Sequence, residues 1–184
     1  MNLIIESLYE NLNKIKELNI RQNLLKNWSE LWLILEKYFH EINILNVSNC
    51  RMNFDRKLFE KRRNLKELIL IDNQLDCLTI ENLIQSFPNL EFLHLDKNNL
   101  TSISENLIFY LNNLTNLSLS ENSFLKQWNP FINRLGKLQN LEELILNQCG
   151  IQTIELIQLG FYILFYFFIS KEKLKIISFY LFLI

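Results

Sequence analysis

Leucine and isoleucine recur along this chain with a fixed spacing, which can be written L-x-x-L-x-L-x-x-N/C-x-L. The pattern fits six times between Ile15 and Ile151, and successive copies begin 27, 23, 25, 24 and 27 residues apart. In each copy, the x-L-x-L-x stretch alternates in the way that predicts a short strand with its leucines inward. A polar or thiol side chain follows at the turn, where it can bond backbone groups that the bend leaves unpaired. The residues at this turn position are Asn23, Cys50, Asn73, Asn98, Asn122 and Cys149.

The segments between these strands favour short helices. The predicted helices are Ser29–Phe39, with Ser29 as its N-cap residue, then Ile80–Phe87, Asn106–Leu111 and Asn129–Leu138, with a weaker single turn at Asp55–Lys61. A strand and a short helix repeated at this period are typical of a leucine-rich-repeat solenoid. We therefore predict an α/β fold of about six repeats, with a curved parallel sheet on the concave side and helices on the convex side.

The two ends of the chain depart from the repeat. Residues 1–14 carry Leu3, Ile4, Leu8 and Leu12 at helical spacing and are predicted to cap the first repeat. The repeat domain is assigned to residues 15–155. The apolar tail, residues 156–184, has three interpretations: a capping helix and strand, a membrane-active segment, or a non-native end such as translated noncoding sequence. Neither of its apolar runs reaches the ~18–20 residues of a spanning helix.

Composition narrows the classes of function. The net charge of −1 gives no basic field for nucleic acid, and the apolar content of 49% suits a folded domain. The three cysteines are widely spaced, and the start of the chain lacks a basic, then apolar, signal segment. These features favour a cytoplasmic protein, with membrane association not expected.

The outward strand positions predict a partner-binding surface. Ile44, Ile69, Ile71 and Phe92 are predicted to gather on neighbouring middle repeats, and clustered exposed apolar residues favour a protein partner. The residues predicted to contact the partner are Ile44, Ile69, Ile71, Phe92, His94 and Asp96. The alternative is that these are scattered apolar groups of the kind that any protein surface carries.

No enzymatic site is predicted. The chain contains no Gly-rich phosphate loop, no H-E-x-x-H and no G-x-S-x-G motif, and it has only three glycines. His94 and Asp96 point to the same face, but no further ligand or base lies in register with them. Cys50 and Cys149 are interpreted as buried turn thiols rather than nucleophiles. We expect no catalytic residue, cofactor, metal ion or small-molecule substrate.

The repeats also resemble a particular family. The segment from Leu18 to Glu30, with its strand followed by N-L-L-x-x-W-x-E, is similar to the first repeat of tubulin-folding cofactor E, a tubulin-specific chaperone. Stretches at Ile44–Ser48, Leu90–Glu105 and Asn140–Ile151 are similar as well. The resemblance covers roughly residues 15–155.

This resemblance implies a protein-binding module that acts on α-tubulin, or on another tubulin cofactor, in tubulin folding and microtubule organisation in the cytoplasm and at the cytoskeleton. The CAP-Gly and ubiquitin-like domains of the family have no counterpart in these 184 residues. A second interpretation is a general intracellular repeat scaffold that regulates a phosphatase or GTPase.

Overall fold

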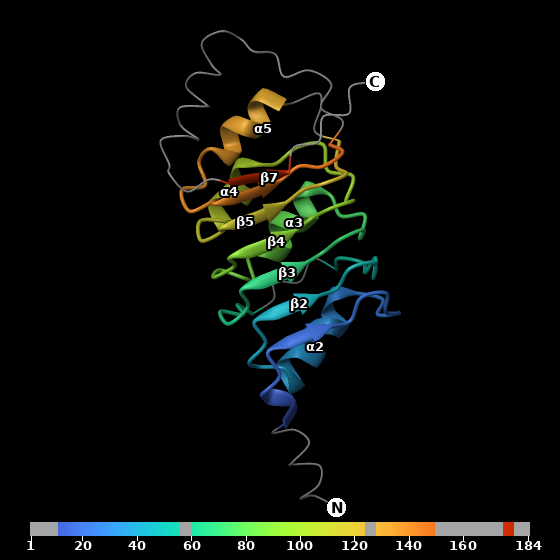
Figure 1. The fold of residues 1–184 in the computed structure, drawn as a ribbon. Helices are drawn as coiled ribbons and strands as arrows, with labels where there is room; N and C mark the ends of the chain where they lie inside the picture. The colour runs from blue at the N-terminus through green and yellow to red at the C-terminus, as the bar shows by residue number, and fades with distance from the viewer. Residues whose placement is uncertain (1–10, 56–59, 124–127, 150–174, 179–184) are drawn as a thin grey trace, which may run out of the picture.

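The computed structural model describes residues 11–55, 60–123, 128–149 and 175–178. Its strands form one parallel sheet in which the spatial order equals the chain order. The strands are β1 (Glu17–Asn19), β2 (Ile44–Asn46), β3 (Glu67–Ile69), β4 (Phe92–His94), β5 (Asn116–Ser118), β6 (Glu143–Ile145) and β7 (Lys175–Ser178). Figure 1 shows the strands stacked one above the other from β1 to β7. The predicted leucine-rich-repeat solenoid is therefore confirmed, with each of the six predicted strands in its expected place.

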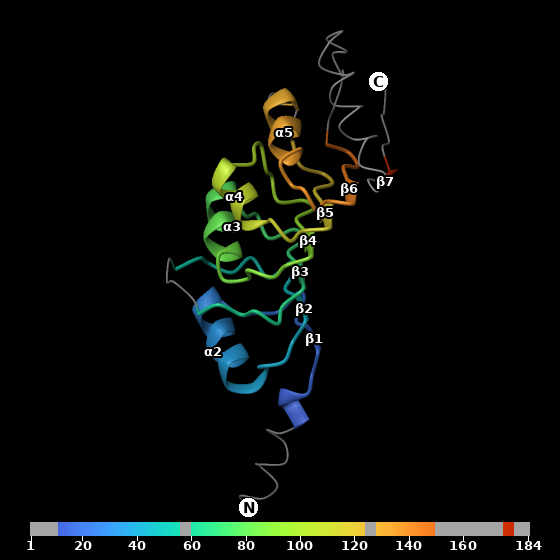
Figure 2. The same cartoon turned by 90° about the vertical axis from the view of Figure 1, so that its left-hand side faces the viewer.

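The helices lie on one side of the sheet, as Figure 2 shows. They are α2 (Trp28–Tyr38), α3 (Cys77–Ile84), α4 (Glu105–Tyr110) and α5 (Trp128–Leu135). Three of them begin at a side chain that accepts a backbone N–H of the first turn, namely Asn27, Asp76 and Ser104. The predicted N-cap at Ser29 was wrong by two residues, because Asn27 caps α2 and places Ser29 inside its first turn. The single turn predicted at Asp55–Lys61 includes residues 56–59, which lie outside the described residues.

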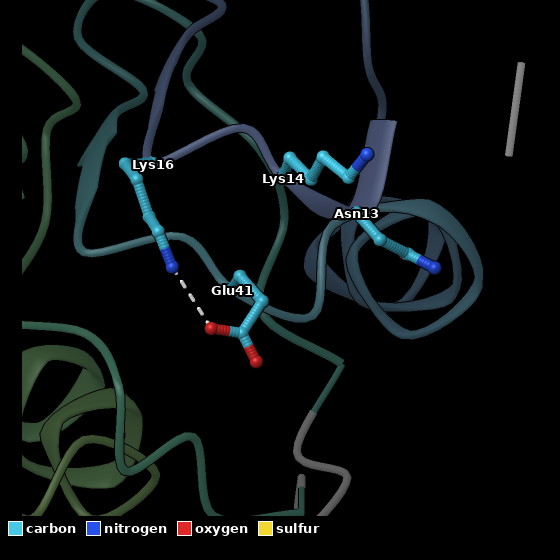
Figure 3. Close-up of a pocket in the computed structure, with 4 residues that line it drawn as sticks. All are labelled: Asn13, Lys14, Lys16 and Glu41. Carbon is cyan, nitrogen blue, oxygen red and sulfur yellow. Dashed lines mark hydrogen bonds and ion pairs between the residues drawn. The ribbon is translucent and has the colours of Figure 1, made fainter. Parts of the chain in front are cut away.

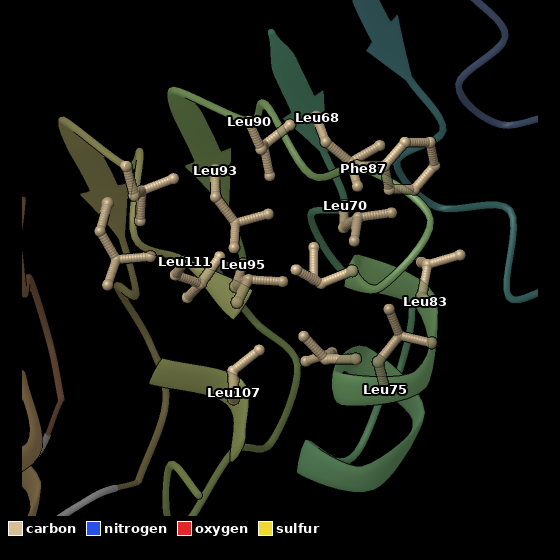
Figure 4. Packing of buried hydrophobic residues seen from close by; sticks show 14 of the residues in the cluster. Leu68, Leu70, Leu75, Leu83, Phe87, Leu90, Leu93, Leu95, Leu107 and Leu111 are labelled. Carbon is tan, nitrogen blue, oxygen red and sulfur yellow. The ribbon is translucent and has the colours of Figure 1, made fainter. Parts of the chain in front are cut away.

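The space between sheet and helices is filled by the repeated leucines. Leu68, Leu93 and Leu117, at the centres of their strands, are fully or almost fully buried. Figure 4 shows Leu95 reaching toward the helical layer, where Leu107 lies near it, while Leu83 of α3 lies near Leu70 and Leu75. One repeat has no second layer of its own, so stacking is what removes these side chains from water.

An asparagine ladder joins the middle repeats. The Oδ1 of Asn98 accepts the backbone N–H groups of Asn73 and Leu75 at 3.1 Å each, and its Nδ2 donates to the Leu70 carbonyl at 2.7 Å. Asn73 and Asn122 bond the repeats before them in the same way, through Oδ1 and Nδ2. A rung is defined here as one repeat's strand and turn. The third, fourth and fifth rungs are therefore each tied to the preceding rung by an asparagine side chain.

At two rungs a cysteine takes the place of asparagine and makes only the donor bond to the preceding rung. Cys50 Sγ donates to the Ile20 carbonyl at 3.2 Å, and Cys149 Sγ donates to the Leu119 carbonyl at 3.3 Å. These are the positions that Nδ2 fills in the asparagine rungs. The interpretation of both cysteines as buried turn thiols agrees with their burial.

The turn position occupied by asparagine or cysteine is called here the ladder position. In all six repeats, the residue just before it has the left-handed backbone conformation. These residues have φ between 53° and 58°, and none is glycine: Gln22, Asn49, Asp72, Lys97, Glu121 and Gln148. A non-glycine residue in this region is disfavoured by roughly 1–2 kcal/mol. The turn is therefore held by the stacked backbone on either side of it, through bonds such as that from the Asp72 amide to the Asp96 carbonyl at 3.0 Å.

Near the start of the chain, residues 11–13 are helical. This turn lies against the connection from α2 to β2, where Asn13 Oδ1 is 2.7 Å from His40 Nδ1. The remainder of the predicted N-terminal cap, residues 1–10, lies outside the described residues. Of the apolar tail, Lys175–Ser178 forms β7 beside β6, and the assignment of the tail as a cap or a non-native end stays a prediction.

Candidate protein-binding surface

The face of the sheet that points away from the helices, called here the open face, carries the predicted site residues. Strand register places Ile44, Glu67 and Phe92 in one row across β2, β3 and β4. Asn46, Ile69 and His94 form the next row. Ile71 and Asp96 lie two residues beyond the ends of β3 and β4. The rows deduced from the repeat pattern are therefore those of the structure.

Ile69 lies at the centre of the apolar patch. Glu67 stands directly between Ile44 and Phe92, so these two residues are two strands, about 10 Å, apart. Both are diagonal neighbours of Ile69, at the ~7–8 Å separation that long side chains span. Ile71 is the next outward residue on the same strand segment as Ile69. All four are half-buried, so the middle of the open face carries four partly exposed apolar side chains on three neighbouring strands.

Polar and charged side chains lie among and beside these apolar residues. His94 Nε2 lies 3.3 Å from Glu67 Oε1, across β3 and β4, and both side chains are about 30% exposed. Lys66 Nζ lies 2.5 Å from Glu91 Oε1 at the beginning of the same two strands. Glu67 is therefore the described partner of His94.

Asp96 has a structural role as well as a place on the face. Its Oδ1 accepts the hydroxyl of Ser118 at 2.5 Å and the backbone N–H of Ser120 at 2.6 Å. The carboxylate thereby connects the fourth rung to the fifth. Since these bonds already occupy one carboxylate oxygen, the contribution of Asp96 to a partner would come from its other oxygen.

Two further open-face residues are not among those predicted to contact the partner. Strand register places Glu67 between Ile44 and Phe92 and against His94. Glu143 accepts a hydrogen bond from Asn116 Nδ2 in the neighbouring strand. The signal for both lies in comparing the same position in adjacent repeats rather than in the sequence around either residue.

Other features of the described residues offer little chemistry. No three His, Cys, Asp or Glu side chains within the described ranges come together as a metal site would require. A hollow lined by Asn13, Lys14, Lys16 and Glu41 contains the Lys16–Glu41 ion pair at 2.9 Å (Figure 3). It lies at the start of the first strands, away from the apolar patch. In the part of the chain that the structure describes, no helix has the length and apolar character needed to cross a membrane.

The N-L-L-x-x-W-x-E segment has a clear structural basis. Trp28 is the first residue of α2 and is 1% exposed, packed in the core. The Glu30 carboxylate accepts the Lys26 amide at 3.1 Å, and the Glu30 amide donates to Asn27 Oδ1 at 2.9 Å, so both residues satisfy backbone groups at the start of the helix. Leu25 packs partly against the core, whereas Leu24 is 93% exposed. The segment thus fixes where the first helix begins.

Fold and surface together define a leucine-rich-repeat protein with an open parallel sheet face suited to binding a protein partner. No family model matches the chain. Curated relatives do, and they confirm the resemblance: the chain is 30% identical over 146 residues to tubulin-folding cofactor E of Arabidopsis thaliana and 29% identical over 143 residues to tubulin-specific chaperone E of Mus musculus. Tubulin-specific chaperone E of Dictyostelium discoideum is 27% identical over 192 residues.

These matches cover 76–80% of this chain but only 26–36% of the relatives, so the chain spans about a quarter to a third of their length. The similarity is therefore to part of a tubulin-folding cofactor. The relatives are named chaperones and folding cofactors, which fits the expectation that the chain is not an enzyme.

Proposed function

We propose that the chain is a tubulin-binding module that takes part in tubulin folding and microtubule organisation in the cytoplasm, and that its open face contacts α-tubulin. The observation that supports this most directly is that three relatives, each from a different organism, are named for tubulin folding or as tubulin-specific chaperones. Another tubulin cofactor is the alternative partner of the same class.

The choice of the open face rests on its chemistry. Ile44, Ile69 and Phe92 are partly exposed apolar side chains on three neighbouring strands, and no described element covers them. Glu67, between Ile44 and Phe92, lies 3.3 Å from His94, and Lys66 pairs with Glu91. Flat strands separated by about 4.8 Å hold these side chains at fixed spacing, so little order has to be gained on binding. The proposed contact residues are Ile44, Ile69, Ile71, Phe92, His94 and Asp96.

The test is direct binding of the full chain to purified α/β-tubulin, measured by fluorescence anisotropy. We expect saturable binding that Phe92→Asp weakens at least tenfold, since central apolar contacts carry most of the affinity of an interface. Phe109→Asp is the matched control, because Phe109 is 68% exposed on α4, on the opposite side of the sheet. It should leave binding unchanged.

Folding of each variant is checked by thermal melting. Phe92→Asp should melt like the wild type, whereas Leu93→Asp, one residue further and fully buried, should unfold the chain because it places a charge in the core. Equal binding by wild type and Phe92→Asp would rule out the open-face patch. Absence of binding by a folded wild type would rule out tubulin and favour the general repeat scaffold.

A further inference from the structure

The first strand of the sheet has an edge that no described strand pairs with. The Ile20 and Gln22 amides donate to carbonyls of the second rung, and the Lys16 carbonyl accepts the Ile44 amide. Even-numbered residues of this segment therefore turn their backbone groups toward β2. By the alternation of a strand, Glu17, Asn19 and Arg21 turn theirs toward the open edge. Such an edge is a template for pairing with another strand.

The side chains along this edge are complementary to themselves. The segment reads Glu17-Leu18-Asn19-Ile20-Arg21, with an acid at one end, a base at the other, and an amide in the middle. If two copies pair antiparallel about Asn19, Glu17 of each chain stands opposite Arg21 of the other. Leu18 stands opposite Ile20, and the two Asn19 residues meet on the two-fold axis.

The hydrogen-bonding pattern fits the same register. Residues 17, 19 and 21 are the ones with outward backbone groups, and the arrangement about Asn19 places them in the hydrogen-bonded pairs of an antiparallel ladder. In the single chain, the Arg21 amide is 3.2 Å from Asn19 Oδ1, a bond that pairing would replace with a backbone bond. Glu17 and Arg21 are exposed, and neither forms an ion pair within the described residues.

The first rung is also less well covered than those that follow. Its inward residues Ile15, Leu18, Ile20 and Leu25 are only partly buried. The corresponding residues of the third rung, Leu65, Leu68, Leu70 and Leu75, are at most 5% exposed. The described N-terminal turn contacts the connection between α2 and β2, where Asn13 lies against His40. A strand paired with β1 would bury more of these partly exposed apolar side chains of the first rung.

We propose that this edge binds a second copy of the chain, with two β1 strands pairing antiparallel about Asn19 in a symmetric dimer. An isologous contact of this kind requires a self-complementary surface, and the opposed charges of Glu17 and Arg21 supply it. The paired sheets would form one continuous open face through two chains.

Sedimentation velocity of the full chain, over a concentration series, tests this. We expect the wild type to dimerise, and Glu17→Arg and Arg21→Glu each to weaken self-association about tenfold or more, because each variant places like charges opposite one another twice. Equal amounts of the two variants, mixed, should dimerise again, since the two arginines of one variant then face the two glutamates of the other. Glu142→Arg and Arg51→Glu change exposed charges elsewhere and should dimerise like the wild type.

Thermal melts confirm that each variant is folded. A wild type that is monomeric at every concentration would overturn the proposal. So would single variants that dimerise as well as the wild type, or a mixture of the two that stays monomeric.

Discussion

The middle rungs and the first rung both have asparagine at the ladder position, yet the asparagine forms different hydrogen bonds in the two places. Asn98 is 1% exposed and bonds two amides and a carbonyl of the third rung. Asn23 is exposed, and its Oδ1 accepts the amide of its own neighbour, Leu24, at 3.1 Å. The ladder asparagine reaches toward the preceding repeat, and no described repeat precedes the first.

The difference shows that the stability of this fold lies between repeats rather than within them. A single rung supplies three strand residues and a turn, which is too little to bury its own leucines or satisfy its own backbone groups. Asn23 therefore occupies the predicted turn position, but its described hydrogen bond is to the backbone of its own repeat and not to another rung.

The largest effect is expected when the asparagine side chain is removed at Asn98, with removal at Asn23 for comparison. Asn98→Ala leaves the buried amides of Asn73 and Leu75 without acceptors, and each unpaired buried group costs about 1–3 kcal/mol. We expect a loss of about 3 kcal/mol or more in the free energy of unfolding, measured by urea denaturation. Asn23→Ala, at an exposed site, should change it by less than about 0.5 kcal/mol.

If the two substitutions destabilise the chain equally, the ladder does not act between rungs. Asn98→Asp separates the two functions of the Asn98 side chain. It keeps an oxygen that accepts the backbone N–H groups of Asn73 and Leu75, but it loses the N–H that donates to the Leu70 carbonyl. An intermediate loss for that variant would show that the acceptor and the donor both contribute.

The repeat pattern predicted the six strands, their register and the inward leucines, because all three follow from spacing alone. Helix bounds were predicted less well, as Ser29 and Asn27 are both good N-cap residues and only the hydrogen bonds of Glu30 distinguish them. The pairing of His94 with Glu67 could not be read locally, since the two residues lie 27 positions apart and meet only through register. Binding of tubulin by the open-face patch depends on the surfaces of two molecules, so the sequence of one of them does not determine it.

Cysteine at the last ladder position offers a second, smaller test. Burial raises the pKa of the Cys149 thiol, against the opposing effect of the Asn122 backbone amide. The folded chain therefore holds this proton more tightly than the unfolded chain does. The stabilisation that follows is complete below the unfolded thiol pKa, about 9, and is lost as pH rises above it.

We expect the free energy of unfolding to fall between pH 8 and about 10, and to fall less steeply in Cys149→Ser, whose hydroxyl can still donate to the Leu119 carbonyl. Cys77, half-exposed on α3 and outside the ladder, provides the control Cys77→Ser. That variant should keep the wild-type slope. Parallel slopes for Cys149→Ser and the wild type would show that the thiol has the same pKa in the folded and unfolded chain.

The smallest test concerns the left-handed turn, which is the one feature that the first rung shares fully with the others. Gln22 and Gln148 have φ of 57° and 53°, in the first and sixth rungs, and neither forms an ion pair among the described residues. Replacing either with glycine removes a penalty of roughly 1–2 kcal/mol and adds about 0.5–1 kcal/mol of unfolded-state entropy, so each should stabilise the chain by about 0.5–1 kcal/mol. Because backbone strain at one residue does not depend on a neighbouring rung, the two gains should be equal in urea denaturation. A gain at Gln148 without one at Gln22 would mean that the first turn relaxes when no rung stacks against it, and that the conformation itself is imposed by stacking.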